Sequence, residues 1–200
     1  MNINIKINNK KKTYSFIDSW NDVSLNSLSR FLAYSKLDAT AAALNTINLF
    51  SDMPKDVIKK LSLEDVLQLM KMLTSMQNEV DAVHKATFTI EGKKYGFIPS
   101  LEDITLGEYA DIESFIKGGI ETNLPNIMSV LFRPIVEENK NTYSIEGYDG
   151  TSQKDRAKIF MKMNAVQVQN SMVFFCNFVN VLSKISVLYL ELKEKLKEKK

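Results

Sequence analysis

Cysteine is nearly absent from this 200-residue chain, and its single occurrence already narrows the fold classes. One cysteine, Cys176, excludes an internal disulfide, so a disulfide-stapled extracellular scaffold is ruled out and a reducing, intracellular setting fits. Because Cys176 lies inside an apolar run, we expect a buried core thiol and not a nucleophile. The N-terminus has no apolar segment behind its charges, so we do not expect a signal peptide.

Histidine and glycine are also scarce, which removes most catalytic arrangements. His84 is the only histidine, and it stands in DAVHKA without a nearby cysteine, so no metal site follows from spacing. No lysine-serine or lysine-threonine step follows Gly118 and Gly119, which indicate a helix stop and not a phosphate loop. Paired acids flank helix ends or loops, where they balance the helix dipole. We therefore expect no catalytic residues, no metal and no cofactor, and a protein that is not an enzyme.

The chain has almost no net charge of either sign. Its 26 lysines and arginines and 24 acids give +2, which is too balanced for a protein that mainly neutralises phosphates. Most of the surplus lies at the two ends, in Lys10 to Lys12 and in the last eight residues, KEKLKEKK. A nucleic-acid-binding accessory protein that uses these lysines with Arg133 and Arg156 is the alternative function, although we do not expect nucleic acid as the partner.

Only one stretch, SMVFFCNFVNVLSKISVLYL, has about the length of a membrane span. Asn177, Asn180, Ser183 and Lys184 interrupt it, and burying each polar group unpaired would cost on the order of 1 kcal/mol or more. We therefore predict no membrane insertion and a helix that is either buried against the protein or partly exposed for self-association.

What the sequence does contain is one stretch written twice, 81 positions apart: KKTYSFIDSWNDVSLNSL and KKYGFIPSLEDITLGEY. An ungapped alignment gives identical pairs at Tyr14/Tyr95, Phe16/Phe97, Ile17/Ile98, Ser19/Ser100, Asp22/Asp103 and Leu25/Leu106. No catalytic pattern accompanies either copy. The duplication indicates a repeated scaffold unit and not a duplicated active site.

Each copy has a strand pattern followed by a helix start. NINIKI alternates apolar and polar residues and TYSFI follows a polar turn, which predicts a β-hairpin. In the second copy ATFTI and YGFI flank EGKK, where Gly92 is free to take positive φ. Thr105 and Glu108 have capping-box spacing, and Ser24 stands in the matching place. The predicted unit is a hairpin and then a helix, with Leu106 as an apolar anchor.

The rest of the chain has mainly helical patterns. DATAAALNTINLFS predicts one helix, and an apolar stripe after Ser62 predicts another. NLPNIMSVLFRPIV predicts a helix that opens at Asn123 and Pro125 and that Pro134 closes. TYSIEGY is a short strand-like piece, and residues 155–198 form a long helical region.

The predicted fold is therefore α+β and predominantly helical, with two short β-hairpin-plus-helix units related by an internal repeat and a long C-terminal helical region. Residues 1–80 hold the first unit and the helices that follow it, 81–135 the second unit, and 136–200 a polar loop and the C-terminal helical region. We expect these parts to form one compact domain, because a unit of this size alone would be marginal.

Four residues are candidates for contact with a partner protein: Trp20, Tyr109, Phe132 and Arg133. Trp20 replaces a leucine of the second copy, and tryptophan is enriched among interface hot spots. Arg133 stands between an aromatic residue and a proline, where its guanidinium either caps carbonyls or pairs with Asp103 or Glu108 as a clamp between helix and hairpin, or else contacts a partner.

Several stretches, taken in order, carry a family resemblance: INNKKKTYSFIDSWNDVSLNSL, KKLSLEDVLQLMKML, IEGKKYGFIPSLEDITLGEYADIE, NIMSVLFRPI, YSIEGYDG and MVFFCNFVNVLSKISVLYLE. Together they resemble small structural and assembly proteins of tailed bacteriophages, in particular phages of gut Bacteroidetes, including crAss-like ones. The resemblance covers most of the chain. It implies a tail assembly chaperone-like or minor virion protein whose partners are phage tail or capsid proteins, or further copies of itself. It also implies action in the host cytoplasm during assembly, or retention in the virion.

Overall fold

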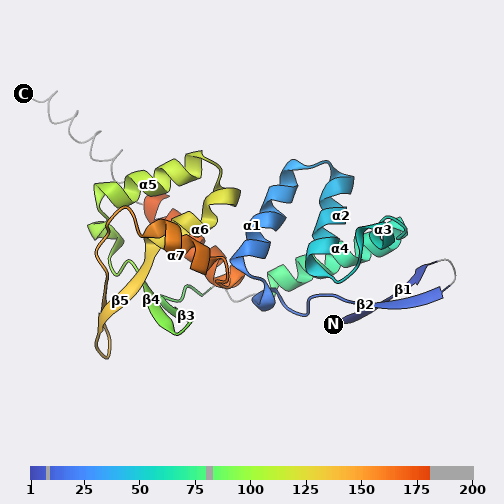
Figure 1. Ribbon diagram of the computed structural model, residues 1–200, viewed down its shortest axis with the longest axis horizontal. Coiled ribbons are helices and arrows are strands. Elements are labelled where there is room, and N and C mark those ends of the chain that lie inside the picture. The colour runs from blue at the N-terminus through green and yellow to red at the C-terminus, as the bar shows by residue number, and fades with distance from the viewer. Residues whose placement is uncertain (8–9, 80–82, 181–200) are drawn as a thin grey trace, which may run out of the picture.

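The computed structural model describes residues 1–7, 10–79 and 83–180, which form an elongated molecule with two halves (Figure 1). One half holds the first hairpin and helices α1 to α4, and the other holds a four-stranded sheet with α5, α6 and α7. The predicted class, α+β and predominantly helical, is confirmed, and the described strands belong to two small sheets.

The elements of the first half are β1 (Asn2–Ile7), β2 (Lys10–Ser15), η1 (Trp20–Asp22), α1 (Leu25–Ala33), η2 (Tyr34–Lys36), α2 (Ala39–Phe50), α3 (Lys55–Ile58) and α4 (Leu63–Asn78), where η marks a 3-10 helix. β1 and β2 pair antiparallel, as predicted, and the alternation of β1 buries Ile5. Ser24, Asp38 and Ser62 cap α1, α2 and α4, each accepting from the backbone N–H three residues on.

The elements of the second half are β3 (Thr87–Ile90), β4 (Lys93–Phe97), η3 (Leu101–Asp103), α5 (Leu106–Lys117), α6 (Ile120–Leu131), β5 (Phe132–Glu138), β6 (Tyr143–Ile145), α7 (Gln153–Phe160) and a helix over residues 165–180. The sheet order is β3-β4-β5-β6, all antiparallel. Glu91 and Gly92 form the β3–β4 turn with φ of 50° and 76°, so the predicted glycine turn is confirmed.

The helix predicted to close at Pro134 ends sooner. α6 starts at Ile120, before the predicted start, and stops at Leu131. Phe132, Arg133 and Pro134 instead belong to β5, where they pair with consecutive residues of β4. Pairing with β4, which the local sequence does not reveal, ends the helix before the proline does.

α6 lies at the centre of the core. It packs against α1 from the first half and against α5 and α7 from the second. Its buried residues are mostly apolar: Leu124, Ile127, Met128, Val130 and Leu131. The buried side chains of both halves belong to a single hydrophobic cluster.

A short stretch, residues 161–165, runs from the end of α7 to the first residue of the next helix and joins the C-terminal part to the first half; we call it the joining segment. Three backbone hydrogen bonds connect it to the start of α1: Leu25 N–H to Met163 C=O (2.6 Å), Asn26 N–H to Met161 C=O (2.9 Å) and Ala165 N–H to Val23 C=O (2.8 Å). The first N–H groups of a helix have no partner inside it. The joining segment supplies these partners for α1.

The two similar stretches of sequence adopt the same order of elements. η1 and η3, and the first residues of α1 and α5, lie at positions that the alignment matches. The capping box predicted at Thr105 and Glu108 is present, whereas Ser24 caps α1 alone. The predicted boundary after residue 135 falls inside β5. Of the predicted C-terminal helical region, residues 181–198 lie outside the described part of the chain.

Candidate functional site

Of the four predicted contact residues, Tyr109 alone lies at the surface, with 41% of its area exposed. Trp20 is 1% exposed, Phe132 0% and Arg133 6%. A partner docking on this conformation cannot pack against side chains covered to that extent. Trp20 and Phe132 are therefore removed from the candidate contact surface, Arg133 meets the outside only through a cavity described below, and Tyr109 stays a prediction.

Trp20 anchors the first half of the core. Its ring lies 5.7 Å from that of Phe31 and 5.6 Å from that of Phe50, both in tilted or edge-to-face arrangements that aromatic pairs favour. Its indole N–H donates to the side-chain oxygen of Gln169 at 2.8 Å. The indole therefore connects η1 to the C-terminal helix and offers no group to a partner.

Arg133 forms an ion pair with Glu108, one of the two carboxylates that the sequence suggested. The Arg133 side chain is 8% exposed and that of Glu108 is 3% exposed, so this ion pair between β5 and α5 is almost completely shielded from solvent. The Glu108 carboxylate also accepts from the Thr105 N–H and hydroxyl, each at 2.6 Å. The ring of Tyr148 lies 5.8 Å from the guanidinium. The arrangement is a structural clamp that holds helix to sheet.

A second polar group lies beside this clamp. The Tyr148 hydroxyl donates to the Asp111 carboxylate, which also accepts from the Gln153 side-chain amide at 2.9 Å. Burial, followed by the hydrogen bond to Asp111, raises the pKa of Tyr148 well above its ordinary value. The phenol thus remains protonated and serves as a donor, which argues for a positioning role and against proton transfer near neutral pH.

A cavity of about 370 Å³ opens over the clamp. Its lining includes Asp103, Thr105, Glu108, Arg133 and Tyr148. Among the residues that the structure describes, the buried Arg133 Nε finds no hydrogen-bond partner. A buried donor without an acceptor is costly, so this cavity is a place where a polar group from outside would be stabilised.

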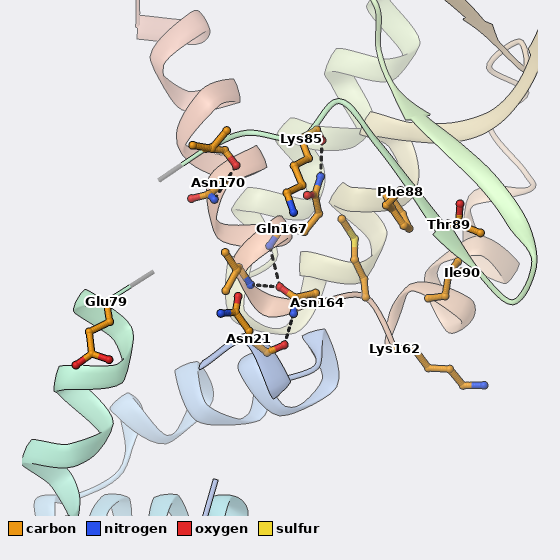
Figure 2. Close-up of a pocket in the computed structure, with 13 residues that line it drawn as sticks. Asn21, Glu79, Lys85, Phe88, Thr89, Ile90, Lys162, Asn164, Gln167 and Asn170 are labelled. Atoms are coloured by element: carbon orange, nitrogen blue, oxygen red, sulfur yellow. Dashed lines mark hydrogen bonds between the residues drawn. The ribbon is translucent and has the colours of Figure 1, made fainter. Parts of the chain in front are cut away.

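A larger cavity of about 710 Å³ lies between the halves (Figure 2). Side-chain amides cross it: Asn164 donates to the Asn21 carbonyl, and Gln167 donates to the Lys85 carbonyl. Asn164 also accepts from the N–H groups that begin the helix over residues 165–180. The Asn164 bond joins the two halves and the Gln167 bond lies within the second half, and neither side-chain amide provides an acid, base or nucleophile.

Within the described ranges, no three histidine, cysteine or acidic side chains gather closely enough to hold a metal ion. In the same residues, no helix is both long and apolar enough to cross a lipid bilayer. Cys176 is exposed, so the predicted core thiol is wrong. It lies on the outer face of its helix because Met172 and Phe175 occupy the buried face.

His84 packs between the sheet and the C-terminal helix. Its ring stacks on Phe174 at 4.6 Å and meets Phe97 edge-on at 4.7 Å, while Nδ1 lies 3.3 Å from the Ser171 hydroxyl. Burial lowers the pKa of His84 below its ordinary value. The neutral imidazole is therefore part of the packing.

This burial predicts a pH-dependent stability. Since the pKa of His84 is lower in the folded state, the unfolded chain binds more protons than the native one below about pH 6.5. The free energy of unfolding should be constant above about pH 7.5 and fall as the pH drops through about 6. Urea denaturation at several pH values measures this. His84→Phe keeps an aromatic ring and should flatten the profile; the same slope in both proteins would contradict the assignment.

An apolar groove of about 510 Å³ runs between α2 and α4. One wall is formed by α2 and the other by α4, and the lining also includes side chains from α3 and the connection to α4: Ala39, Thr40, Ala43, Leu44, Ile47, Ile58, Lys59, Leu61, Leu63, Val66, Leu67 and Met70. Leu63 is 74% and Leu67 53% exposed. In each wall the lining residues recur at positions i, i+3, i+4 and i+7, the spacing of one helix face. The groove is thus lined like two sides of a three-helix bundle.

The groove was not predicted from the sequence, although part of its signal is visible there. The apolar stripe of α4 divides in the structure: Leu69 and Leu73 are buried in the core, whereas Leu67 faces the groove. The alanine-rich α2 carries the matching stripe. Each stripe alone indicates only an amphipathic helix, and the sequence does not show that the two lie side by side.

Comparison with known proteins adds no relative. No protein-family model, no curated protein and no solved structure matches this chain.

Proposed function

We propose that the protein is a non-enzymatic assembly protein of a tailed bacteriophage that binds other structural proteins of the tail or capsid. Its role is that of a tail assembly chaperone or a minor virion component, exercised in the host cytoplasm and, in the second case, retained in the particle. The apolar groove between α2 and α4 is the single observation that carries the binding role. The resemblance to phage assembly proteins supplies the class of partner.

The groove favours a helix as its occupant. Its two walls present side chains at the spacing of helix faces, and a third amphipathic helix would complete the bundle. Leu63 and Leu67 lie exposed at the groove, and burying a leucine side chain contributes about 1.5–3 kcal/mol. A partner helix with leucine or methionine at the same spacing would cover both.

We also propose that the hairpin-plus-helix stretches are two copies of one scaffold unit. The matched starts of η1 and η3, and of α1 and α5, support this proposal. In this interpretation the two units and α6 hold the α2–α4 groove on a rigid support.

The expected result for Leu67→Asp is loss of the partner. The full chain, mixed with the tail and capsid proteins encoded beside it, should give a complex in size-exclusion chromatography. The carboxylate of the variant would be buried against an apolar helix, so we expect about tenfold weaker binding or more. Isothermal titration with the captured partner gives the dissociation constant.

Val173→Asp is the matched control, because Val173 is similarly exposed on a helix of the other half. It should leave binding unchanged. Two outcomes contradict the proposal: no complex at any salt concentration, or a complex that tolerates Leu67→Asp. Binding to nucleic acid with a steep salt dependence would favour the alternative function instead.

A further inference from the structure

The two units differ in what covers the start of their helices. In the first unit the joining segment occupies the two N–H groups that begin α1, and it also uses carbonyls just before the helix. The Val23 carbonyl accepts from the Ala165 N–H at 2.8 Å, and the Asn21 carbonyl accepts from the Asn164 side chain. Leu25 is 0% exposed under this cover.

The same surface of the second unit is bare. Leu106, which aligns with Leu25, is 85% exposed, so the predicted apolar anchor is wrong. In the described chain, the N–H groups of Leu106 and Gly107 have no hydrogen-bond partner, and neither do the carbonyls of Glu102 and Ile104. These four groups correspond to the four that are satisfied in the first unit. The second unit thus repeats the docking surface without its occupant.

The cavity over the Arg133 clamp borders this surface and points independently to a ligand. Thr105, the cap residue of α5, and Asp103 belong to its lining. Arg133, which is more than nine-tenths buried, also lines it, and its Nε lacks an acceptor. An incoming oxygen atom would supply the missing hydrogen bond. The surface therefore combines unpaired backbone groups with an exposed leucine, and the cavity beside it, which shares Asp103 and Thr105 with the same motif, holds a buried donor.

We propose that this second-unit surface, formed by Glu102, Ile104, Leu106, Gly107 and Tyr109, binds a short non-helical segment of a partner protein. The segment presents two backbone carbonyls to the N–H groups of Leu106 and Gly107, and one N–H to the carbonyl of Ile104. The residue whose carbonyl faces Leu106 also carries an apolar side chain, which covers Leu106 and Tyr109. The proposal rests on the proposed binding role and adds a contact of a different kind, since the groove takes a helix.

The joining segment defines the chemistry that fits. It uses the carbonyls of Met161 and Met163, two residues apart, with the apolar Met163 side chain 2% exposed, followed by Asn164. In a second copy of this chain the same segment is already engaged with its own first unit. For this reason the occupant is assigned to a different protein.

A synthetic peptide of residues 157–168, AKIFMKMNAVQV, blocked at both ends, is the probe. Added to the full chain labelled with nitrogen-15, it should shift the amide signals of Leu106 and Gly107 in a saturable way. Leu106→Asp should weaken this binding by about tenfold or more, whereas Ile116→Lys, on the same helix and also exposed, should not. A peptide in which aspartate replaces Met163 should bind the wild-type chain weakly. Its affinity should be about that of the native peptide for the Leu106→Asp chain.

Leu106→Pro removes the backbone donor together with the leucine side chain. Proline is favoured at the first position of a helix, and Thr105, with φ of −73° and ψ of 157°, has the conformation that a following proline requires. The fold should survive while the donor is lost, and binding should fall. Shifts confined to residues 21–26, no saturable shift, or equal affinity in wild type and both Leu106 variants would overturn the proposal.

These outcomes are distinct from those of the groove. Leu67→Asp should leave peptide binding unchanged, because Leu67 lies in the other half of the molecule. If the peptide fails to bind while Leu67→Asp still disrupts the partner complex, the second-unit surface is wrong and the proposed function stands. If neither Leu67→Asp nor Leu106→Asp affects any complex, both are wrong.

Discussion

Replacing Glu108 with alanine should lower the free energy of unfolding by about 3–5 kcal/mol, because the change leaves the Arg133 guanidinium buried without its counter-charge. Loss of the capping box contributes to this value, since Glu108 also accepts from the Thr105 N–H. Urea denaturation at pH 7, followed by the fluorescence of Trp20, measures the effect.

Glu108→Gln and a double variant separate the two causes. Glutamine can still reach the Thr105 N–H but cannot neutralise Arg133, so most of the loss should persist. Glu108→Leu combined with Arg133→Met removes both charges and should recover much of the stability, because apolar replacements of a buried pair are often nearly neutral. A loss below about 1 kcal/mol in Glu108→Ala would show that the pair is hydrated.

Trp20→Ala should destabilise the chain by about 3–5 kcal/mol, the range for truncating a large aromatic side chain in a core. The substitution empties the space between Phe31 and Phe50 and leaves the Gln169 side chain without its donor. Because the chain has one tryptophan, the unfolding of this variant has to be followed by circular dichroism.

Trp20→Phe is the matched variant, since it keeps an aromatic ring and deletes the indole N–H. It should lose less stability than Trp20→Ala, because the remaining ring still fills part of the site. Equal losses in both variants would indicate that the hydrogen bond to Gln169 dominates. A loss below about 1 kcal/mol in Trp20→Ala would contradict the burial of the indole.

Local chemistry made much of the fold predictable. Gly92 sits where a tight hairpin turn requires positive φ, and the caps at Ser24 and Thr105 begin the expected helices. β5 was not predictable in this way, because Pro134 resembles a helix terminator. Its strand conformation depends on pairing with Tyr95 of β4, a contact between distant parts of the chain.

Within the candidate site, only the ion pair of Arg133 could be predicted from the sequence. The sequence named Asp103 and Glu108 among the possible partners of the Arg133 guanidinium, and the structure pairs it with Glu108. The burial of Trp20 and the exposure of Leu106 did not follow from their motifs, which are similar. A segment far along the chain covers one motif and leaves the other open, and neither motif carries a local signal of that difference.

The joining segment also orders events during synthesis. The hydrogen bond of Trp20 cannot form until Gln169, 149 positions later in the chain, has been synthesised. The hydrogen bonds at the start of α1 likewise require residues 161–165. At about 5–20 residues per second, roughly 7–30 s separate the synthesis of these partners. During that interval the start of α1 is uncovered, as the start of α5 is in the folded protein. A protein that binds the start of α5 would also encounter the uncovered start of α1 on the ribosome. There it would compete with the joining segment for the same backbone groups.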